Sequence, residues 1–346
     1  MIRFFSKNRT ASLLVISAVS FALIGAFAPG FLSFATVRTI LINGMIMMTV
    51  SLGVMGVLLT RNIDVSVGST LGLSAAVLGL LLQAEVALPL AMAGALATGL
   101  LAGLLNGVLV AVIGVPAIIA TLGTLGLYRG LLLILTGGVW IENLPQSLKA
   151  LASPRFAGFP ILIFVVAAIV LLAHLFLSHT RKGRFVYAVG DNRDAARHIG
   201  LPVRHIELSV FVFAGLMSAV GGIIFAAQIG FLPGQAGSGI ELRVIAACVL
   251  GGISLLGGSG TVAGLVVAVF FLTSIDSALI YLRIPGYWND LIAGAMLLLV
   301  LVVDGRLRLL IDKSVRAKRY ANHASTDKGQ SLIKATPGLT TSGGNQ

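Results

Sequence analysis

The feature that most constrains this chain is a series of long apolar runs separated by short polar links. A run of about twenty apolar residues can span a bilayer as a helix, because a helix satisfies its own backbone hydrogen bonds in hydrocarbon. Only 10% of the residues are charged, whereas a soluble domain carries roughly a quarter. The sequence therefore predicts an all-α polytopic membrane protein with about ten transmembrane helices. The apolar runs fall near residues 11–28, 40–60, 66–83, 86–113, 115–135, 160–177, 207–227, 243–257, 259–281 and 287–303.

Basic residues are concentrated in three short patches. Three Lys or Arg lie in 1–9, six in 178–206 and eight in 305–346. The positive-inside rule places such patches on the cytoplasmic side of a membrane. Six runs precede 178–206 and four follow it, and both numbers are even. We therefore expect a multi-pass protein of the cell inner membrane with both termini in the cytoplasm. A nine-span alternative, in which 243–257 and 259–281 fuse into one helix, would put the basic C-terminal patch outside.

The chain divides into a membrane domain and a tail. Residues 1–312 form the predicted transmembrane domain, which contains the cytoplasmic loop 178–206. Residues 313–346 lose the apolar periodicity and end in TPGLTTSGGNQ, which predicts a basic and mostly disordered cytoplasmic tail. The net charge of +12 could suggest nucleic acid as a partner. Nucleic-acid binding calls for a basic groove with interleaved aromatic residues, and because the sequence shows none, we expect no nucleic-acid partner.

The loop 178–206 contains the stretch GDNRDAARHIGLP, which has the signals of a short helix. Asp191 or Asn192 can cap the start of a helix, and the charges that follow complement its dipole. Gly200 is a natural helix stop, and the next residue but one is a proline. The stretch therefore predicts a helix of about two turns, which would be marginal alone in water.

The predicted loop helix has a small apolar face formed by Ala195, Ala196 and Ile199. Such a face suits seating in a groove of another protein. The alternative is that the helix packs on its own membrane domain or on lipid headgroups. Physical arguments alone leave these two interpretations open.

Polar residues interrupt the apolar sequence most clearly in LLTRNIDVSVGST, residues 58–70. A charge near the bilayer centre costs about 2.5–3.5 kcal/mol on insertion scales, so such residues usually pair or face water. If this segment is helical, Arg61 and Asp64 are spaced to form an ion pair. Two interpretations remain: a broken helix that lines a solute path, or a short cytoplasmic turn. The candidate path residues are Arg61, Asn62, Asp64, Asn106 and Asp276.

Glycines recur at four-residue spacing on two of the predicted spans. Gly99, Gly103 and Gly107 share one helix face, and Gly126 and Gly130 share another. Missing side chains let neighbouring helices approach closely in a membrane. Each face predicts either static close packing or a surface that slides during a conformational change.

Motifs for catalysis and nucleotide binding are missing from the sequence. It contains no HExxH, GxSxG or CxxC motif. It also contains no Gly-Lys dipeptide and hence no Walker A loop. We therefore expect that the chain is not an enzyme and carries no metal or cofactor of its own.

Several segments resemble the permeases of monosaccharide-type ABC importers. The pattern T-x-x-GR followed by A-x-GDN-x-x-AA-x-x-IG is similar to the cytoplasmic coupling segment of that family. The segments IDVSVGS, PAIIATLGTLGLYRG, GIELRVIAACVLGGISLLGGSGT and WNDLIAG are also similar to the family, and the resemblance covers roughly residues 40–305. Sugar permeases of the family typically have two glycines where Arg61 and Asn62 stand here. This difference favours the subgroup of permeases from autoinducer-2 importers.

The resemblance implies a ten-helix fold of the cobalamin-importer, or type II, class. It implies a permease subunit that forms the path for a small sugar-like solute: autoinducer-2 or, alternatively, ribose or another monosaccharide. The implied partners are ABC ATPase subunits with two nucleotide-binding domains, a second permease, which we expect to be a related chain, and a periplasmic solute-binding protein. ATP hydrolysis would then belong to the separate ATPase. The residues implied to couple to it are Gly183, Arg184, Gly190, Asp191, Asn192, Ala195, Ala196 and Gly200.

The main rival from another class is an ion-coupled secondary transporter. It would use Asp64 or Asp276 as a proton or cation site within the membrane. The capped loop helix favours the ABC importer, because a secondary transporter has no need of it.

Overall fold

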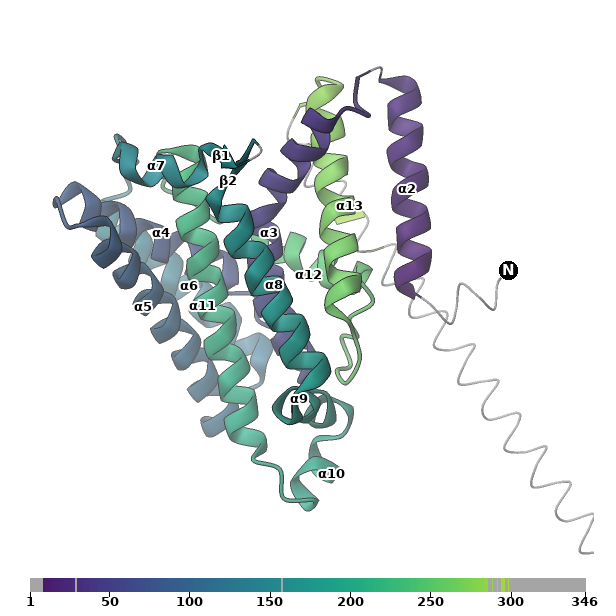
Figure 1. Cartoon of the computed structure of the whole chain (residues 1–346). Helices are drawn as coiled ribbons and strands as arrows, with labels where there is room; N and C mark the ends of the chain where they lie inside the picture. Colours follow the sequence, from purple (N-terminus) through teal and green to yellow (C-terminus); the bar gives the residue numbers. More distant parts are fainter. Residues whose placement is uncertain are drawn as a thin grey trace, which may run out of the picture. The chain divides into compact units, whose positions relative to one another are not determined.

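The computed structural model describes residues 9–28, 30–156 and 158–285, together with five single positions between 288 and 298. Apart from one antiparallel pair of very short strands, the regular secondary structure of this part is helical (Figure 1). The helices are α2 (Arg9–Phe27), α3 (Phe34–Leu59), α4 (Val67–Gln83), α5 (Leu88–Gly107), the π-helix η1 (Val108–Ile113), α6 (Ala117–Thr136), α7 (Gln146–Ala152), α8 (Ile161–His179), α9 (Arg181–Asp191), α10 (Arg193–His198), α11 (Val203–Ile229), α12 (Ile240–Leu250) and α13 (Val262–Tyr281). The strands are β1 (Pro154–Phe156) and β2 (Phe159–Pro160).

The helices support a polytopic membrane protein but do not establish ten spans. Six helices of the described part are long and apolar enough to cross a membrane. Two shorter apolar helices, Leu13–Ala26 and Val67–Gln83, match two further predicted runs. The six are Phe34–Leu59, Leu88–Ile113, Ala117–Thr136, Ile161–His179, Val203–Ile229 and Val262–Tyr281.

Two of the ten predicted spans are not found as full helices in the described residues. The run 243–257 gives only α12, which has 11 residues and spans about 16 Å, roughly half of the hydrocarbon thickness. It ends at Leu250 because two glycines follow, the second of them with φ 83°. The run 287–303 lies mostly outside the described residues, as does the predicted tail 313–346. The tail and the boundary at 312 therefore stay predictions.

Helix α3 forms the centre of the described part. Every residue from Met48 to Leu59 is buried, and α11, α12 and α13 all pack against it. Helix α5 packs on α11 through the predicted glycine face: a Cβ added at Gly99 would lie 2.4 Å from the carbonyl oxygen of Gly215, and one at Gly103 would lie 2.4 Å from that of Phe211. The prediction of close packing is confirmed for this face.

The second predicted glycine face, on α6, has a different environment. Within the part of the chain that the structure describes, no atom lies within 4 Å of a Cβ added at Gly126 or Gly130. The same is true of Gly123. Close packing of this face is therefore not seen among the described residues.

The segment between α11 and α12, residues 230–239, is not helical. It runs along a glycine face of α4, with the carbonyl of Ala236 at Gly72 and the side chain of Leu232 at Gly79. Arg129 of α6 donates a hydrogen bond to the Ala236 carbonyl at 3.1 Å. Non-helical backbone is tolerated beside membrane helices when other protein groups form hydrogen bonds with its N–H and C=O groups. The glycines of α4 supply the space, and Arg129 supplies a donor.

Candidate functional site

The predicted loop helix is present, but a second helix precedes it. Asn192 caps the predicted helix, now α10, and its Oδ1 accepts a hydrogen bond from the Ala195 amide at 2.9 Å. Gly200 ends this region with φ 82°, which confirms the predicted stop. Helix α9 was not predicted; it begins where the Thr180 hydroxyl accepts a hydrogen bond from the Gly183 amide at 2.9 Å. A threonine cap ahead of buried positions spaced three and four apart could have revealed it.

The apolar face predicted on α10 is divided between two environments, which corrects the sequence interpretation. Ala196 is buried and packs with Val189 of α9 and Val203 of α11. Ala195 is exposed, and Ile199 is 74% exposed. Successive residues of a helix point about 100° apart, so neighbouring alanines need not share a surface. Only Ala195 and Ile199, four residues apart, form an outer apolar strip, and Ala196 holds α10 to the rest of the chain.

The C-terminal end of α9 lies directly against the end of α3. A Cβ added at Gly190 would lie 1.7 Å from the carbonyl oxygen of Leu59, so only glycine fits. The same carbonyl accepts a hydrogen bond from the Gly258 amide at 3.0 Å. Asp191 lies beside Gly258: a Cβ added at Gly258 would lie only 2.8 Å from the Cα of Asp191. Three backbone segments therefore meet at one point, which we call the Leu59 junction (Leu59, Gly190, Asp191 and Gly258).

A tyrosine adds a second attachment for α9. The Tyr187 hydroxyl donates a hydrogen bond to the Gly260 carbonyl at 3.0 Å, next to the start of α13. Burial raises the pKa of Tyr187 above its ordinary value, because the buried site disfavours the charged phenolate. The side chain therefore stays a neutral donor at physiological pH.

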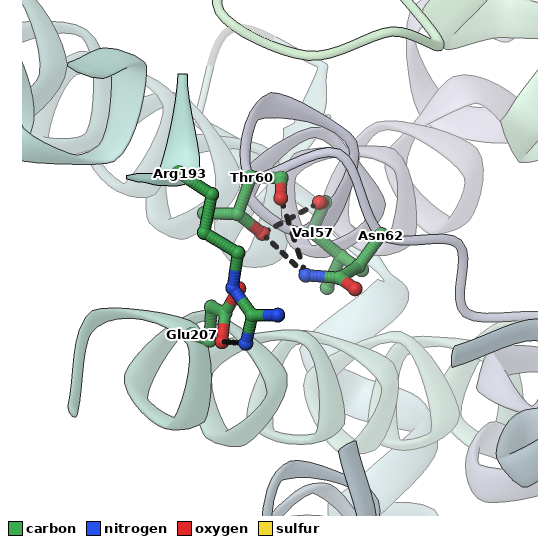
Figure 2. Close-up of polar contacts among 5 residues, drawn as sticks. All are labelled: Val57, Thr60, Asn62, Arg193 and Glu207. Carbon is green, nitrogen blue, oxygen red and sulfur yellow. Dashed lines mark hydrogen bonds and ion pairs between the residues drawn. The ribbon is translucent and has the colours of Figure 1, made fainter. Parts of the chain in front are cut away.

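An ion pair attaches α10 to α11. Arg193 lies 2.7 Å from the carboxylate of Glu207, whose side chain is 3% exposed, while that of Arg193 is 49% exposed. Burying an unpaired carboxylate is costly, so Arg193 stabilises the first turns of α11 as well as α10. Figure 2 shows this pair together with the end of α3, where Thr60 donates to the Val57 carbonyl at 2.8 Å and Asn62 donates to the Thr60 carbonyl at 3.2 Å. These bonds form an ordered turn at the end of α3.

The remaining coupling candidates lie at the start of α9. Gly183 is buried, and a Cβ there would lie 2.2 Å from the Phe176 carbonyl of α8. This close approach makes the sharp turn from α8 into α9. Arg184 is exposed on the next position. The candidates Gly183, Gly190, Asn192 and Ala196 thus shape the segment, whereas Arg184 and Ala195 lie on its outer surface.

The residues 60–66 are not helical, so the condition for an ion pair of Arg61 with Asp64 is not met, and the pair does not form. Arg61 is exposed and has φ 66°, a left-handed backbone conformation. Asp64 is buried and instead accepts hydrogen bonds from the Ser66 amide at 2.8 Å and the Ser66 hydroxyl at 2.7 Å. The i, i+3 spacing argument fails because it holds only for a helix.

Two path candidates that are distant in sequence, Asp64 and Asn106, come together. The Asn106 amide donates to the Asp64 carboxylate at 3.4 Å and to the Ser66 hydroxyl at 2.8 Å. Both residues are buried, and Tyr128 of α6 lies against them, donating to the Ala102 carbonyl at 2.9 Å. This cluster ties the α3–α4 link to α5 and α6. In this conformation, the two polar side chains bind each other and their neighbours.

Asp276, the last path candidate, is also paired. It lies on α13 and forms an ion pair with Arg243 of α12. The two side chains are 23% and 25% exposed. The pair therefore joins the short helix α12 to α13. Neither Arg243 nor Glu207 was singled out from the sequence, because each stands near the end of an apolar run, where charges are common.

Metal binding finds no support in the described residues. Within them, no group of three or more His, Cys, Asp or Glu side chains could hold a metal ion.

Comparison with known proteins defines the class. The family described as "Branched-chain amino acid transport system / permease component" matches residues 36–301. The chain belongs to this family, and it is the membrane-spanning permease component of an ABC import system rather than an enzyme. The predictions of class and of a non-enzymatic role are confirmed. No solved structure matches the chain.

The relatives point to a narrower group. The chain is 48% identical to the autoinducer 2 import system permease protein LsrC of Salmonella typhi over 325 residues, 94% of each chain. It is 48% identical to the LsrC protein of Klebsiella pneumoniae over 331 residues, 96% of each. It is 44% identical to that of Photorhabdus laumondii over 332 residues, which cover 96% of this chain and all of the relative. The resemblance seen in the sequence to the autoinducer-2 subgroup is confirmed.

Proposed function

We propose that the chain imports autoinducer-2 as one permease of an ABC importer, with a separate ATPase docked on α9 and α10. The observation that carries the coupling role is the two-sided arrangement of this segment. Its inner side is held by the Leu59 junction and by Ala196, and its outer side presents Ala195 and Ile199. An element that is fixed to the membrane helices and open on its other face can pass on the movement of a partner.

The mechanism that follows is alternating access driven from outside the chain. When ATP closes the ATPase, α9 and α10 move with it. Because the backbone of α9 lies against that of α3 at Leu59, the movement reaches the central helix without flexible side chains between them. Through Tyr187 and Gly260 it also reaches the start of α13. The permease itself performs no chemistry, and ATP binding stays with the ATPase, because this chain has no Walker A loop.

The solute follows from the relatives and from the residues that separate the subgroup. The relatives named as autoinducer 2 permeases are 44% to 49% identical to this chain. Arg61 and Asn62 also stand where sugar permeases of the resembling family have glycines. Ribose or another monosaccharide is the alternative solute. Ion-coupled transport is less well supported, because Asp276 is paired with Arg243 and Asp64 is held by Ser66 and Asn106.

The finer architecture is part of the same proposal. We infer ten spans of the type II class, with the N-terminus, the α9–α10 segment and the C-terminus in the cytoplasm, on the strength of the three basic patches. A second permease, a related chain, would pack against this one, and a periplasmic binding protein would deliver the solute. The open glycine face of α6 supports a helix partner from another chain, since membrane helices associate through such faces.

The test compares two carboxylates introduced on α10. Ile199→Glu places a charge on the outer strip, and Ala196→Glu places one in the buried cluster. We expect Ile199→Glu to accumulate at the wild-type level but to retain the ATPase at least about tenfold less well on co-purification, a loss of roughly 1.4 kcal/mol. ATP-dependent uptake of labelled autoinducer-2 into vesicles should fall with it. Ala196→Glu should instead lower the amount of folded permease, because its charge is buried.

Lys149→Ala, on α7, is the matched control and should leave both readouts unchanged. Normal ATPase binding and normal uptake by Ile199→Glu would contradict the docking role of α10. Uptake driven by a pH gradient without any ATPase would contradict the ABC mechanism itself.

A further inference from the structure

An apolar groove of about 720 Å³ lies between α2, α3, α8 and α13. Figure 1 shows these helices as neighbours in the same part of the molecule. The groove is separate from the Leu59 junction and from the outer strip of α10 described above. Its volume falls in the range of sites that hold small ligands.

The walls of the groove are almost entirely apolar. Of the side chains that line it, only Ser17, His174 and Thr273 are polar. Three exposed alanines on three different helices widen it: Ala18, Ala167 and Ala263. An apolar cavity stays dry, and an empty one forfeits dispersion contacts on every wall. In a bilayer, the groove is therefore best filled by an acyl chain.

The chain becomes basic just beyond one end of the groove. His174 is the last residue of α8 that lines it, and the ring of His179 lies 6.1 Å from that of His174, edge to face. Arg181 and Lys182 follow at once, and both are exposed. Basic pockets between membrane helices bind the headgroups of anionic lipids. An anionic phosphate thus complements this end, and an acyl chain complements the rest.

We propose that the groove binds an anionic phospholipid, with one acyl chain between α2, α8 and α13 and its phosphate at the α8–α9 corner. This site goes beyond the proposed import function, because it requires only that the chain lies in a membrane. It also places the lipid on the helix that leads directly into α9. Occupancy therefore stiffens the helix that carries the coupling segment.

The experiment measures lipid retention by the purified full-length chain, without any ATPase. The protein in detergent is titrated with phosphatidylglycerol or with phosphatidylcholine of the same acyl chains, and bound lipid is counted by native mass spectrometry. We expect phosphatidylglycerol to be retained at least about tenfold better. Ala167→Trp should fill the groove and abolish this retention. Ala168→Trp, at the next residue of α8, is exposed and does not line the groove, so it should retain lipid as the wild type does.

A second pair of variants tests the headgroup. Arg181→Gln combined with Lys182→Gln should remove the preference for phosphatidylglycerol over phosphatidylcholine. Arg204→Gln, an exposed cation in the first turn of α11, should keep the preference. Each variant is first checked for a single symmetric peak in size-exclusion chromatography, so that loss of folding is not counted as loss of lipid.

Three outcomes would overturn the proposal. Equal lipid retention by Ala167→Trp and Ala168→Trp would show that the groove is not the site. Equal retention of the two lipids by the wild type would show that the headgroup is not recognised. In a separate co-purification with a second permease, loss of that chain from Ala167→Trp, with lipid retention unchanged, would show that a protein helix fills the groove. None of these outcomes bears on whether α10 binds the ATPase.

Discussion

Helices α5 and α6 carry the same kind of glycine face but use it differently. On α5, Gly99 and Gly103 meet the backbone of α11, and a Cβ at either position would lie 2.4 Å from a carbonyl oxygen. On α6, Gly126 and Gly130 have no atom within 4 Å of an added Cβ among the described residues. The spacing of glycines thus shows that a helix face permits close approach. It does not show whether the approaching helix belongs to the same chain.

The partner explains the difference between the two faces. Helix α11 offers its own glycine at the contact: a Cβ at Gly215 would lie 2.1 Å from the Gly99 carbonyl. The two backbones therefore interlock from both sides. The candidate span of α11 is 72% buried, whereas that of α6 is 28% buried. The surface of α6 is accordingly the one left for another chain or for lipid.

The largest effect is predicted for a substitution that disrupts the packing of the α5 glycine face on α11. Gly103→Val puts a branched side chain against backbone atoms of α11, which are unable to move aside as a flexible side chain would. We expect a cost above the roughly 1–3 kcal/mol of ordinary overpacking and near-complete loss of folded permease, measured by fluorescence-detected size-exclusion chromatography of membrane extracts.

Gly126→Val is the matched control for this comparison. It should accumulate at close to the wild-type level as a single chain, and it should recover less of a second permease on co-purification. If Gly126→Val is lost as completely as Gly103→Val, the α6 face packs within its own chain and the distinction between the two faces fails.

The same contrast between inner and outer faces recurs in the coupling segment. Helix α9 packs through Gly183 and Gly190, each of which meets a carbonyl of another helix. Beyond α10, Gly200 is required for a different reason: its φ is 82°, and no described atom lies within 4 Å of an added Cβ. Helix α10 is therefore held mainly by side chains, namely Ala196 and Arg193.

The second prediction sharpens this contrast at Arg193. Arg193→Ala leaves the buried Glu207 without its cation. A fully buried pair would lose about 3–5 kcal/mol, and we expect less, because the Arg193 side chain is 49% exposed. Arg197→Ala, an exposed cation of the same helix, is the control. Thermal unfolding followed by fluorescence should show a clear loss for Arg193→Ala and little for Arg197→Ala.

An equal loss in both variants would mean that net charge, and not the pair with Glu207, stabilises α10. An unchanged melting temperature for Arg193→Ala would mean that Ala196 alone holds the helix.

The sequence predicted those features that depend on local chemistry. The cap, which the sequence placed at Asp191 or Asn192, and the Gly200 stop were readable because each follows from one residue type in one backbone conformation. The inward position of Ala196 was not, because a helix of six residues has too few apolar positions to define one face. For the α3–α4 link, the sequence left a helix and a turn both open, and the spacing of Arg61 and Asp64 is informative only for a helix, which these residues do not form.

The prediction of membrane topology from the sequence was limited by a different ambiguity. The run 243–257 is apolar except for Arg243 and Ser254, yet its helix stops at Leu250. Hydropathy measures only how apolar a segment is, and a short buried helix can be as apolar as a helix that spans the membrane. The path of the segment before α12 along α4 depends on Gly68 and Gly72, more than 150 residues earlier, so no local pattern could have shown it.

The smallest predicted effect concerns Tyr187, which attaches the inner helix α9. Tyr187→Phe keeps the ring and removes only the hydrogen bond to the Gly260 carbonyl, which is worth about 1 kcal/mol. At pH 8 the variant should therefore melt slightly below the wild type, by roughly 2 °C or less.

Burial raises the pKa of Tyr187 in the folded protein, whereas in the unfolded chain it stays near the ordinary value of about 10. Below pH 10 both states keep the proton, and the stability contributed by Tyr187 is fully present. As the pH rises through 10, the unfolded chain ionises first, so the wild type loses stability that Tyr187→Phe never had. The difference in melting temperature should thus shrink between pH 8 and pH 11. A difference that stays constant or grows over this range would show that Tyr187 is not held as a neutral donor, and that α9 is attached to the rest of the chain by its glycines alone.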